Sequence, residues 1–343
     1  MVQATVHEPF DLLAAFVAHY LELGADLIHL HFDTPHPEAE AAFRGHPKIQ
    51  MTLCDTAYWA RMKPAGRPLA HPKRQRVNAR KTFAKLKYDW LFLCDADEYL
   101  VPRHDMATML AAQPAHLDFL RVSMAEKVLP PGLTPDTVFE GVFRLPHPAG
   151  QTYAETIYGP QLATVLERVV AGHDLGKSIL RRGGDFGINV HWPVARLPKA
   201  GSAASPVEPV GAWLPDACLA HYDALTPLYY LVKLLGKHLS DQAIIDTGQI
   251  PRLLHRSRVA QIEMAVAACA EHDAVAKTAP LHHLTPQSMQ ALRNLGLLLE
   301  LDLAPDRIAR KHFPHLNLDF SPATFDRALR IKHATTLAKM GLA

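Results

Sequence analysis

The sequence predicts an α/β protein: a doubly wound, Rossmann-type, mostly parallel sheet with helices on both faces, followed by a helical C-terminal portion. Three observations lead to this prediction. Short strand-like segments alternate with helix-compatible segments from Val2 to Cys94. Acidic residues follow several of these strands, at the edge where such sheets bind ligands. From about Thr226 the chain changes to long helix-compatible segments. We therefore expect two parts, residues 1–225 and residues 226–343.

Six segments of the sequence have the character of β-strands. Each is a short segment rich in aliphatic and aromatic residues that ends in a turn. Four of them come before Asp95 in the sequence. They are Val2–His7, Asp26–Asp33, Lys48–Asp55 and Trp90–Cys94, with two later candidates in Leu117–Met124 and Thr137–Leu145.

The expected helices follow from apolar residues at helical spacing. The segment after the first strand carries such a stripe between Phe10 and Leu21, and Gly24 is a suitable terminator. A basic helix is expected over Lys73–Lys87, and Pro193–Pro215 is expected to be an irregular loop. The C-terminal helices are predicted at Leu228–His238, Val259–His272, Pro286–Leu301 and Pro322–Met340.

Composition excludes several classes of protein. The formal charge of +2 gives no global attraction to nucleic acid or to an anionic membrane, so we expect no nucleic-acid partner. No apolar run reaches the roughly 18 uncharged residues of a membrane span, and the N-terminus lacks the pattern of a signal peptide. The four scattered cysteines suit a reducing compartment. We expect a cytoplasmic protein, with attachment at the periphery of the inner membrane as an alternative.

The most informative stretch is an apolar strand that ends in three carboxylates. In "WLFLCDADEYL", Asp95 and Asp97 stand one residue apart and Glu98 follows. Two carboxylates at such a turn can share Mg²⁺ or Mn²⁺, which prefer oxygen ligands. The alternative is a solvated turn whose acidic residues precede a helix near Met106, where they favour the helix dipole. A D-x-D pair alone is weak evidence, because chance supplies about one in a chain of this composition.

Further segments add to this motif. The opening "TVHEPFDLLAAFVAHYLELGADLIHLHFD", the helix "RQRVNARKTFAKLKYDW" and the later "GKSILRR", "INVHW" and "LAHYD" occur in an order that resembles GT-A-fold glycosyltransferases. The similarity is greatest to the family 2-like group that carries a DxDE-aromatic motif, and it covers about Val2–Lys237. His7 stands where that group usually has Asn, and the helical C-terminal third matches nothing in it.

The resemblance implies a donor site for a nucleotide-diphosphate sugar. The ends of the first two strands lie beside the base and ribose in that group, and the basic helix turns one face towards the donor. The alternative for Glu8 is an ordinary carboxylate at a helix N-terminus. The alternative for Lys177 is an exposed lysine in a β-turn. The implied donor-binding residues are Thr5, Glu8, Asp33, Arg74, Gln75, Asn78, Asp95, Lys177 and Ser178.

The resemblance also implies a metal site and catalytic groups. Asp95 and Asp97 would hold Mn²⁺ or Mg²⁺, and His191 or His221 would complete the shell, although a histidine at a strand end is commonly a structural hydrogen-bonding group. The expected catalytic residues are Asp97, Glu98 and Glu126. Glu126 is the candidate base, with a loop carboxylate paired to Lys127 or solvent as its alternative.

Together these expectations describe a metal-dependent, inverting glycosyltransferase of the hexosyltransferase type. Its acceptor would be a glycan or a lipid-linked glycan, and bacterial surface polysaccharide assembly is the process implied by the group. Two alternatives stay open: an aspartate-nucleophile phosphohydrolase, and a non-catalytic module that binds a sugar nucleotide or a glycan. The helical C-terminal portion would embrace the acceptor, form a homodimer or lie on a membrane, the last being least favoured.

Overall fold

The computed structural model of the chain describes residues 1–62, 66–196, 205–251 and 255–342. The chain divides into two compact units that interleave along the sequence. Unit 1 comprises Met1–Ser123, Leu175–Leu219 and Ile308–Leu316, and unit 2 comprises Met124–Asp174, Ala220–Arg307 and Asn317–Ala343. This division differs from the expected boundary after residue 225, because residues 124–174 belong with the C-terminal helices and a short late segment belongs with the N-terminal sheet.

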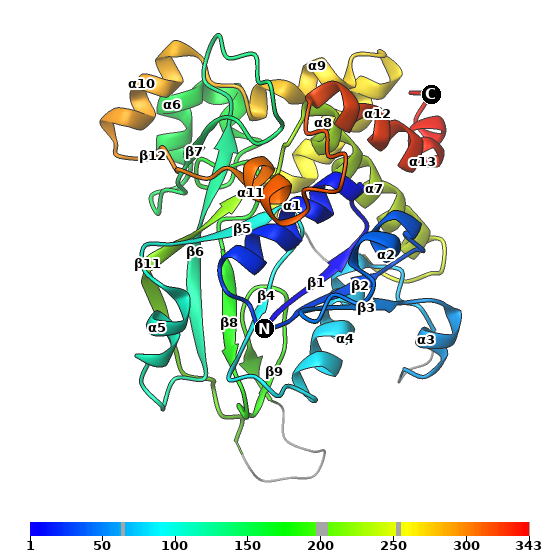
Figure 1. Cartoon of the computed structure of the whole chain (residues 1–343). Coiled ribbons are helices and arrows are strands. Elements are labelled where there is room, and N and C mark those ends of the chain that lie inside the picture. Colours follow the sequence, from blue (N-terminus) through cyan, green and yellow to red (C-terminus); the bar gives the residue numbers. More distant parts are fainter. Residues whose placement is uncertain (63–65, 197–204, 252–254, 343) are drawn as a thin grey trace. The chain divides into compact units, whose positions relative to one another are not determined.

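The centre of unit 1 is a parallel sheet with the strand order β3-β2-β1-β4 (Figure 1). Val2 of β1 is in register with Ile28 of β2 on one side and with Phe92 of β4 on the other. The predicted Rossmann-type core is therefore confirmed. Its strands are β1 (Val2–Val6), β2 (Ile28–Phe32), β3 (Ile49–Leu53) and β4 (Trp90–Leu93).

Antiparallel strands extend this core beyond β4. The strand β8 (Lys177–Arg181) pairs with β4, and the first residues of β6 (Phe119–Val128) pair with β8. The strand β5 (Glu98–Pro102) pairs with β11 (Gly211–His221). The small hairpin of β9 (Phe186–Gly187) and β10 (Val194–Ala195) completes the strands of unit 1. The result is a mixed sheet whose parallel strands, from β4 to β3, form one end. The strand β11 occupies part of the segment expected to be a loop, of which residues 197–204 lie outside the described residues.

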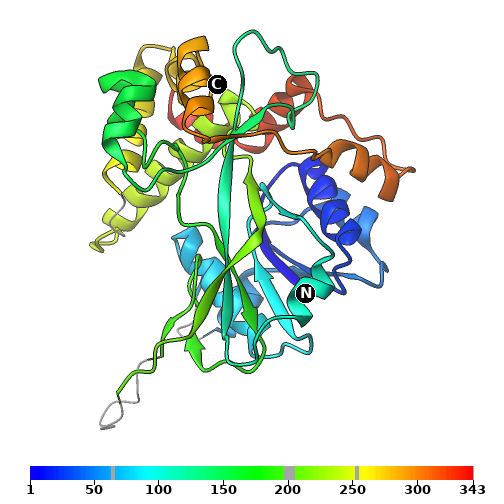
Figure 2. The same cartoon turned by 90° about the vertical axis from the view of Figure 1, so that its left-hand side faces the viewer.

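Helices cover both faces of the parallel strands, as Figure 2 shows for α1 (blue) and α4 (cyan). Residues Leu12–Tyr20 of α1 are all buried, as expected for a helix that is apolar on every side. The Tyr20 hydroxyl donates to the Glu98 carbonyl (2.8 Å) and accepts from the Leu100 amide (3.2 Å), so α1 fixes the start of β5. The helices that begin in unit 1 are α1 (Phe10–Glu22), α2 (Pro37–Phe43), α3 (Thr56–Ala60), α4 (His71–Phe83) and α5 (Met106–Ala111).

Unit 2 is mainly helical, as predicted. The last residues of β6 pair with β7 (Val142–Arg144), which pairs with β12 (Leu298–Leu299). The expected helix Pro286–Leu301 is too long: α10 ends at Asn294, and the chain then forms β12. Thr226, Thr285 and Ser321 cap three helices whose first residue is proline. The helices are α6 (Gln151–Ala163), α7 (Pro227–Ile245), α8 (Arg256–Ala270), α9 (Ala274–Thr278), α10 (Pro286–Asn294), α11 (Pro305–His312, which ends in unit 1), α12 (Pro322–Lys332) and α13 (Ala334–Lys339).

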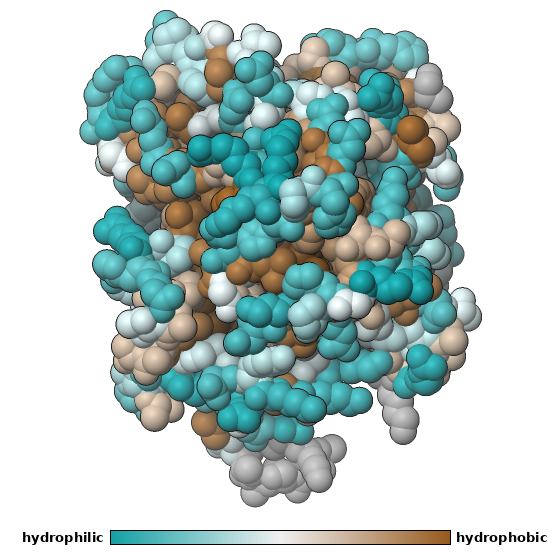
Figure 3. Space-filling model, viewed as in Figure 1, coloured by the Kyte–Doolittle hydropathy of each residue, from teal (hydrophilic) through white to brown (hydrophobic). Residues whose placement is uncertain are grey.

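One face of the molecule is largely polar. Figure 3 shows hydrophilic residues over much of the viewed face, with hydrophobic residues scattered among them. Across the described ranges, no helix combines the length and the apolar character needed to cross a membrane.

Gly176 controls how β8 enters the sheet. Its φ is +70°, and a Cβ atom there would lie 2.0 Å from the Val122 carbonyl oxygen, a backbone atom that cannot move aside. We expect Gly176→Ala to destabilise the fold by more than about 3 kcal/mol, because backbone strain and a steric clash add. Urea unfolding followed by circular dichroism measures this loss.

Gly183 provides the matched control. Its φ is +86°, but no atom lies within 4 Å of the position a Cβ would take. Gly183→Ala therefore tests backbone strain without the clash and is expected to cost about 1–2 kcal/mol. Equal losses for the two variants would show that the contact with Val122 does not matter.

Candidate functional site

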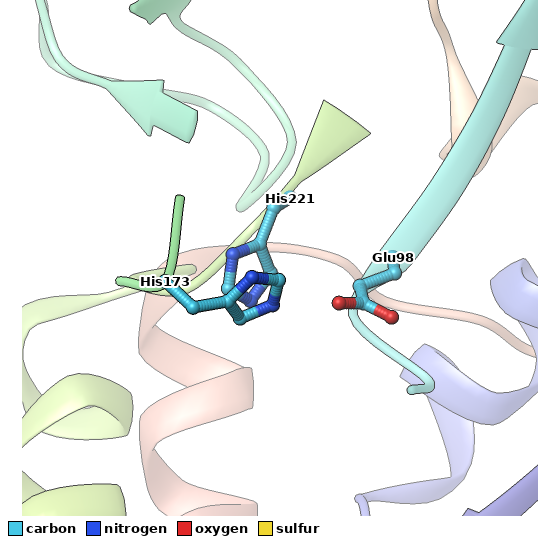
Figure 4. A group of neighbouring side chains, drawn as sticks. All are labelled: Glu98, His173 and His221. Atoms are coloured by element: carbon cyan, nitrogen blue, oxygen red, sulfur yellow. The ribbon is translucent and has the colours of Figure 1, made fainter. Parts of the chain in front are cut away.

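The acidic turn joins β4 to β5 and is buried. Asp97 is 4% exposed and Glu98 is fully buried. A Glu98 carboxylate oxygen accepts from the Asp95 amide (2.8 Å), and the Glu98 amide donates to the Asp95 carbonyl (3.1 Å), which closes the turn. Glu98 begins β5, where Figure 4 draws its side chain. The alternative of a solvated turn before a helix is wrong, since α5 is capped by Asp105 instead.

Two further elements bring polar groups to Asp95. Gln75 on α4 donates from Nε2 to one carboxylate oxygen. Lys177, the first residue of β8, lies with its Nζ 2.6 Å from the other oxygen and 3.2 Å from a Glu98 oxygen. Burial alone would lower the pKa of Lys177, but the Asp95 and Glu98 carboxylates hold it above its usual value. The ammonium is therefore charged and shared by both acids.

The face of α4 also holds the end of β1. Asn78 is fully buried; its Nδ2 donates to the Thr5 hydroxyl (2.9 Å), and its Oδ1 accepts from the Tyr58 hydroxyl (2.7 Å). The expected shared face of Gln75 and Asn78 is thus found. Asn78 is bonded inside the protein, however, and its contribution is to orient Thr5.

A second buried ion pair lies at the end of β2. Arg74 donates from Nε to both oxygens of Asp33 (2.8 and 3.1 Å) and from Nη1 to the Pro68 and Leu69 carbonyls. Burial alone would raise the pKa of Asp33, but His71, Arg74 and other cations lower it to about 2. Asp33 is therefore ionised, and Arg74 anchors the loop before α4.

A small recess, open to solvent, lies at the carboxyl ends of β1 and β4, and some of these groups line it. The helix α1, which follows β1, and the helix α4, which precedes β4, cover opposite faces, so this edge is the topological switch point of the parallel strands. Four residues expected at a donor site lie here together: Thr5, Gln75, Asp95 and Lys177. The remaining lining residues are Gln3, Arg76, Ala79, Leu93, Cys94, Asn189 and Val190.

Eight predicted residues of unit 1 do not line this recess. Five of them are described above: Asp33, Arg74, Asn78, Asp97 and Glu98. Ser178 is buried within β8, in register with Arg121. His191 is half-buried, and its Nδ1 lies 3.0 Å from the Gly176 carbonyl oxygen. Glu8 lies before α1 and accepts from the His7 amide (2.6 Å). Sequence reasoning missed Asn189 as a lining residue, although it stands in the quoted "INVHW" segment.

Glu8 has an electrostatic role. Burial raises its pKa from 4.5 to about 7, and the negative charges of Asp97 and Asp95 contribute. The folded chain thus holds a proton that the unfolded chain releases between these values, and stability falls as the pH rises through this window. We expect Glu8→Gln to stabilise the protein by up to about 2 kcal/mol at about pH 8 and to have little effect at about pH 4. Urea unfolding at both pH values measures this.

Glu22 gives the control of opposite sign. It lies on α1, and its bonds to Lys311 and His312 lower its pKa. Glu22→Gln should therefore give no stabilisation at the higher pH. A Glu8→Gln effect that is the same at both pH values would contradict the electrostatic role of Glu8.

In unit 2, Glu126 is held inside a network of hydrogen bonds. Arg144 donates to its Oε2 from Nε (2.7 Å) and Nη2 (2.5 Å), and the amides of Ala171 and Gly172 donate to its two oxygens (3.0 and 2.5 Å). Burial alone would raise the pKa of Glu126, but the Arg144 guanidinium lowers it. The partner is therefore Arg144 rather than Lys127. A fully buried carboxylate with a lowered pKa is poorly suited to accept a proton, so the geometry favours a structural role over the predicted base.

His221, the other predicted metal ligand, also belongs to unit 2. Its ring lies beside that of His173, with centroids 5.1 Å apart (Figure 4), and its Nε2 is 3.7 Å from an Asp223 oxygen. Its role as a metal ligand stays a prediction.

Unit 2 also brings Glu126, Asp223 and His282 together, with possible ligand atoms within 4.8 Å of one another. The two acids already have cationic partners, since Arg144 contacts Glu126, and Lys233 and Arg258 contact Asp223. This group does not fit a divalent cation. The acidic turn of unit 1 fits better, because its three carboxylates, on Asp95, Asp97 and Glu98, outnumber the single ammonium of Lys177 that pairs with two of them. The negative charges of Asp95 and Asp97 also act on Glu8.

Comparison with known proteins identifies no family. The chain matches no protein-family model and no curated protein. Among solved structures, it is similar to residues 1–349 of S. aureus TarS at a TM-score of 0.32 and 10% identity, over 81% of this chain and 80% of that one. HddC from Yersinia pseudotuberculosis is similar at a TM-score of 0.32 and 11% identity, over 67% of this chain and 95% of HddC. The structure of TarS 1–349 in complex with UDP-GlcNAc is similar at a TM-score of 0.33 and 11% identity, over 77% of this chain and 70% of that one. Scores of this size identify neither the fold nor the function of the chain.

Proposed function

We propose that the protein is a glycosyltransferase of the GT-A fold that moves a sugar from a nucleotide-diphosphate donor to a hydroxyl of a glycan or lipid-linked glycan. The supporting observation is the recess at the carboxyl ends of β1 and β4, where Thr5, Gln75, Asp95 and Lys177 meet. These residues come from separate stretches of sequence. Each had been expected at the donor site from the resemblance alone, and a switch point is where such sheets bind nucleotides.

The residues have separate roles in this proposal. Lys177 supplies positive charge for the diphosphate, and Gln75 holds Asp95. Asp95 and Asp97 would hold Mn²⁺ or Mg²⁺, which when bound stabilises charge on the departing nucleoside diphosphate. Arg74 and Asn78 act indirectly, through Asp33 and Thr5.

The proposal includes three finer statements from the sequence. The sugar is a hexose transferred with inversion, the process is polysaccharide assembly, and the location is cytoplasmic. The anomeric configuration of the product, read by proton NMR, tests the first of these statements directly.

The first experiment is a thermal denaturation series with UDP, GDP and CDP, each with and without Mn²⁺. A ligand that binds only the folded chain raises its melting temperature. We expect one nucleotide to stabilise the wild type in a metal-dependent manner and to have no such effect on Asp97→Ala. Release of the same nucleoside diphosphate from its sugar donor then separates an enzyme from a non-catalytic binding module. No shift with any of the three would contradict the donor proposal and favour the phosphohydrolase alternative.

A further inference from the structure

Lys177 lies inside the acidic motif that is proposed to bind the metal. Its side chain is 2% exposed, and its Nζ is 2.6 Å from Asp95 and 3.2 Å from Glu98. Both carboxylates are thereby bound to a cation that the chain itself supplies. Removing a charged group from water is costly unless it has such partners, so the buried ammonium depends on these two carboxylates.

The position of this ammonium affects any second cation. Asp95 accepts from Gln75 with one oxygen and from Lys177 with the other. A divalent ion bound to Asp95 would take an oxygen that the ammonium already contacts, and two cations a few ångströms apart repel strongly in a partly buried site. The ammonium of Lys177 should therefore weaken the binding of a divalent cation at Asp95 and Glu98.

The Lys177 side chain also lies beside a position where an anion could bind. Lys177 borders the recess together with Thr5 and Asp95. A lysine ammonium is a compact charge on a flexible four-carbon stem, so it can leave a carboxylate for a nearby anion by rotating side-chain bonds alone. A diphosphate in the recess would offer it such an anion.

From these contacts, and resting on the proposed donor site, we propose that Lys177 is an internal counter-ion that couples metal binding to donor binding. Without a nucleotide, its ammonium pairs with both Asp95 and Glu98 and weakens the binding of divalent cations there. When a nucleoside diphosphate enters, the ammonium turns to the phosphates and frees the carboxylates for the metal. Nucleotide and metal then bind with positive cooperativity, which is reciprocal by linkage.

The test is the affinity for Mn²⁺ alone, measured from the electron paramagnetic resonance signal of free Mn²⁺. In the absence of nucleotide, Lys177→Met should bind Mn²⁺ at least about tenfold more tightly than the wild type, because the competing charge is gone. Lys177→Arg, which keeps the charge, should not. Lys85→Met removes an exposed lysine of the same unit and controls for the change in net charge. Addition of the nucleotide should tighten Mn²⁺ binding in the wild type far more than in Lys177→Met.

An unchanged or weaker affinity of Lys177→Met for Mn²⁺ without nucleotide would overturn the inference. Thermal denaturation first establishes that each variant is folded, and Lys177→Gln, which retains hydrogen-bond donors, carries the same test if the methionine variant is unstable. The outcomes separate the two proposals. A wild type that binds no nucleotide, with a Lys177→Met variant that gains Mn²⁺ affinity, refutes the donor and keeps the ion-pair competition. If nucleotide promotes Mn²⁺ binding but Lys177→Met has no effect on it, the donor proposal is kept and the role of Lys177 is refuted.

Discussion

The substitution Asp97→Asn is expected to slow sugar transfer by at least about a thousandfold, the scale on which metal-assisted charge stabilisation contributes to catalysis. Asp97 is buried in the acidic turn directly before β5. Asn has the same shape but no negative charge, so the fold should persist while the attraction for a divalent cation is lost. The measurement is the rate of nucleoside diphosphate release from the donor in the presence of Mn²⁺.

Asp89→Asn is the matched control. Asp89 belongs to the same unit, but it is exposed and pairs only with exposed Arg182 in the contacts of the described chain. Its replacement should leave the rate unchanged. An Asp97→Asn variant that turns over at the wild-type rate would show that this carboxylate plays no part in the reaction.

Arg144→Met is expected to cost unit 2 about 3–5 kcal/mol of folding stability. The change removes the guanidinium that donates twice to Glu126 and leaves a buried carboxylate without its cation. Arg144 also donates to the Leu281 carbonyl and the Tyr158 hydroxyl, so one substitution disrupts four hydrogen bonds. Urea unfolding measures the loss, and exposed Arg293→Met serves as the control.

A double variant shows whether the charge or the shape matters. In Glu126→Leu with Arg144→Met, no charge of this pair remains buried, and much of the lost stability should return. A double variant no more stable than Arg144→Met alone would point to packing and to the backbone amides of Ala171 and Gly172, which also bind Glu126.

The sequence predicted the parallel core and part of the site because both depend on local patterns. The strands β1 to β4 are short apolar segments, and Gln75 and Asn78 are one helical turn apart, which places them on one face. Asp95 follows β4 directly. The placement of the basic helix beside the donor site came from the resemblance to a known group rather than from these local patterns.

Other features depend on contacts between distant residues, which no local pattern reveals. Lys177 is 82 residues from Asp95, so its ion pair could not be predicted from spacing. For Glu126, the alternative to a catalytic base was a pair with its neighbour Lys127 or with solvent. Along a strand, however, adjacent side chains point to opposite faces, and Arg144 on the paired strand β7 faces Glu126 instead. The segment rich in Pro, Gly and Ala appeared irregular, yet pairing with β5 and β6 makes its end the strand β11.

A crystal structure with the stabilising nucleoside diphosphate and Mn²⁺ tests the central claim most directly. The account predicts a nucleotide over the carboxyl ends of β1 and β4, beside Thr5 and Gln75. It also predicts an anomalous manganese peak between Asp97 and the diphosphate, with the Lys177 ammonium moved from Asp95 to a phosphate oxygen. A nucleotide bound elsewhere, or a manganese ion away from the acidic turn, would contradict it.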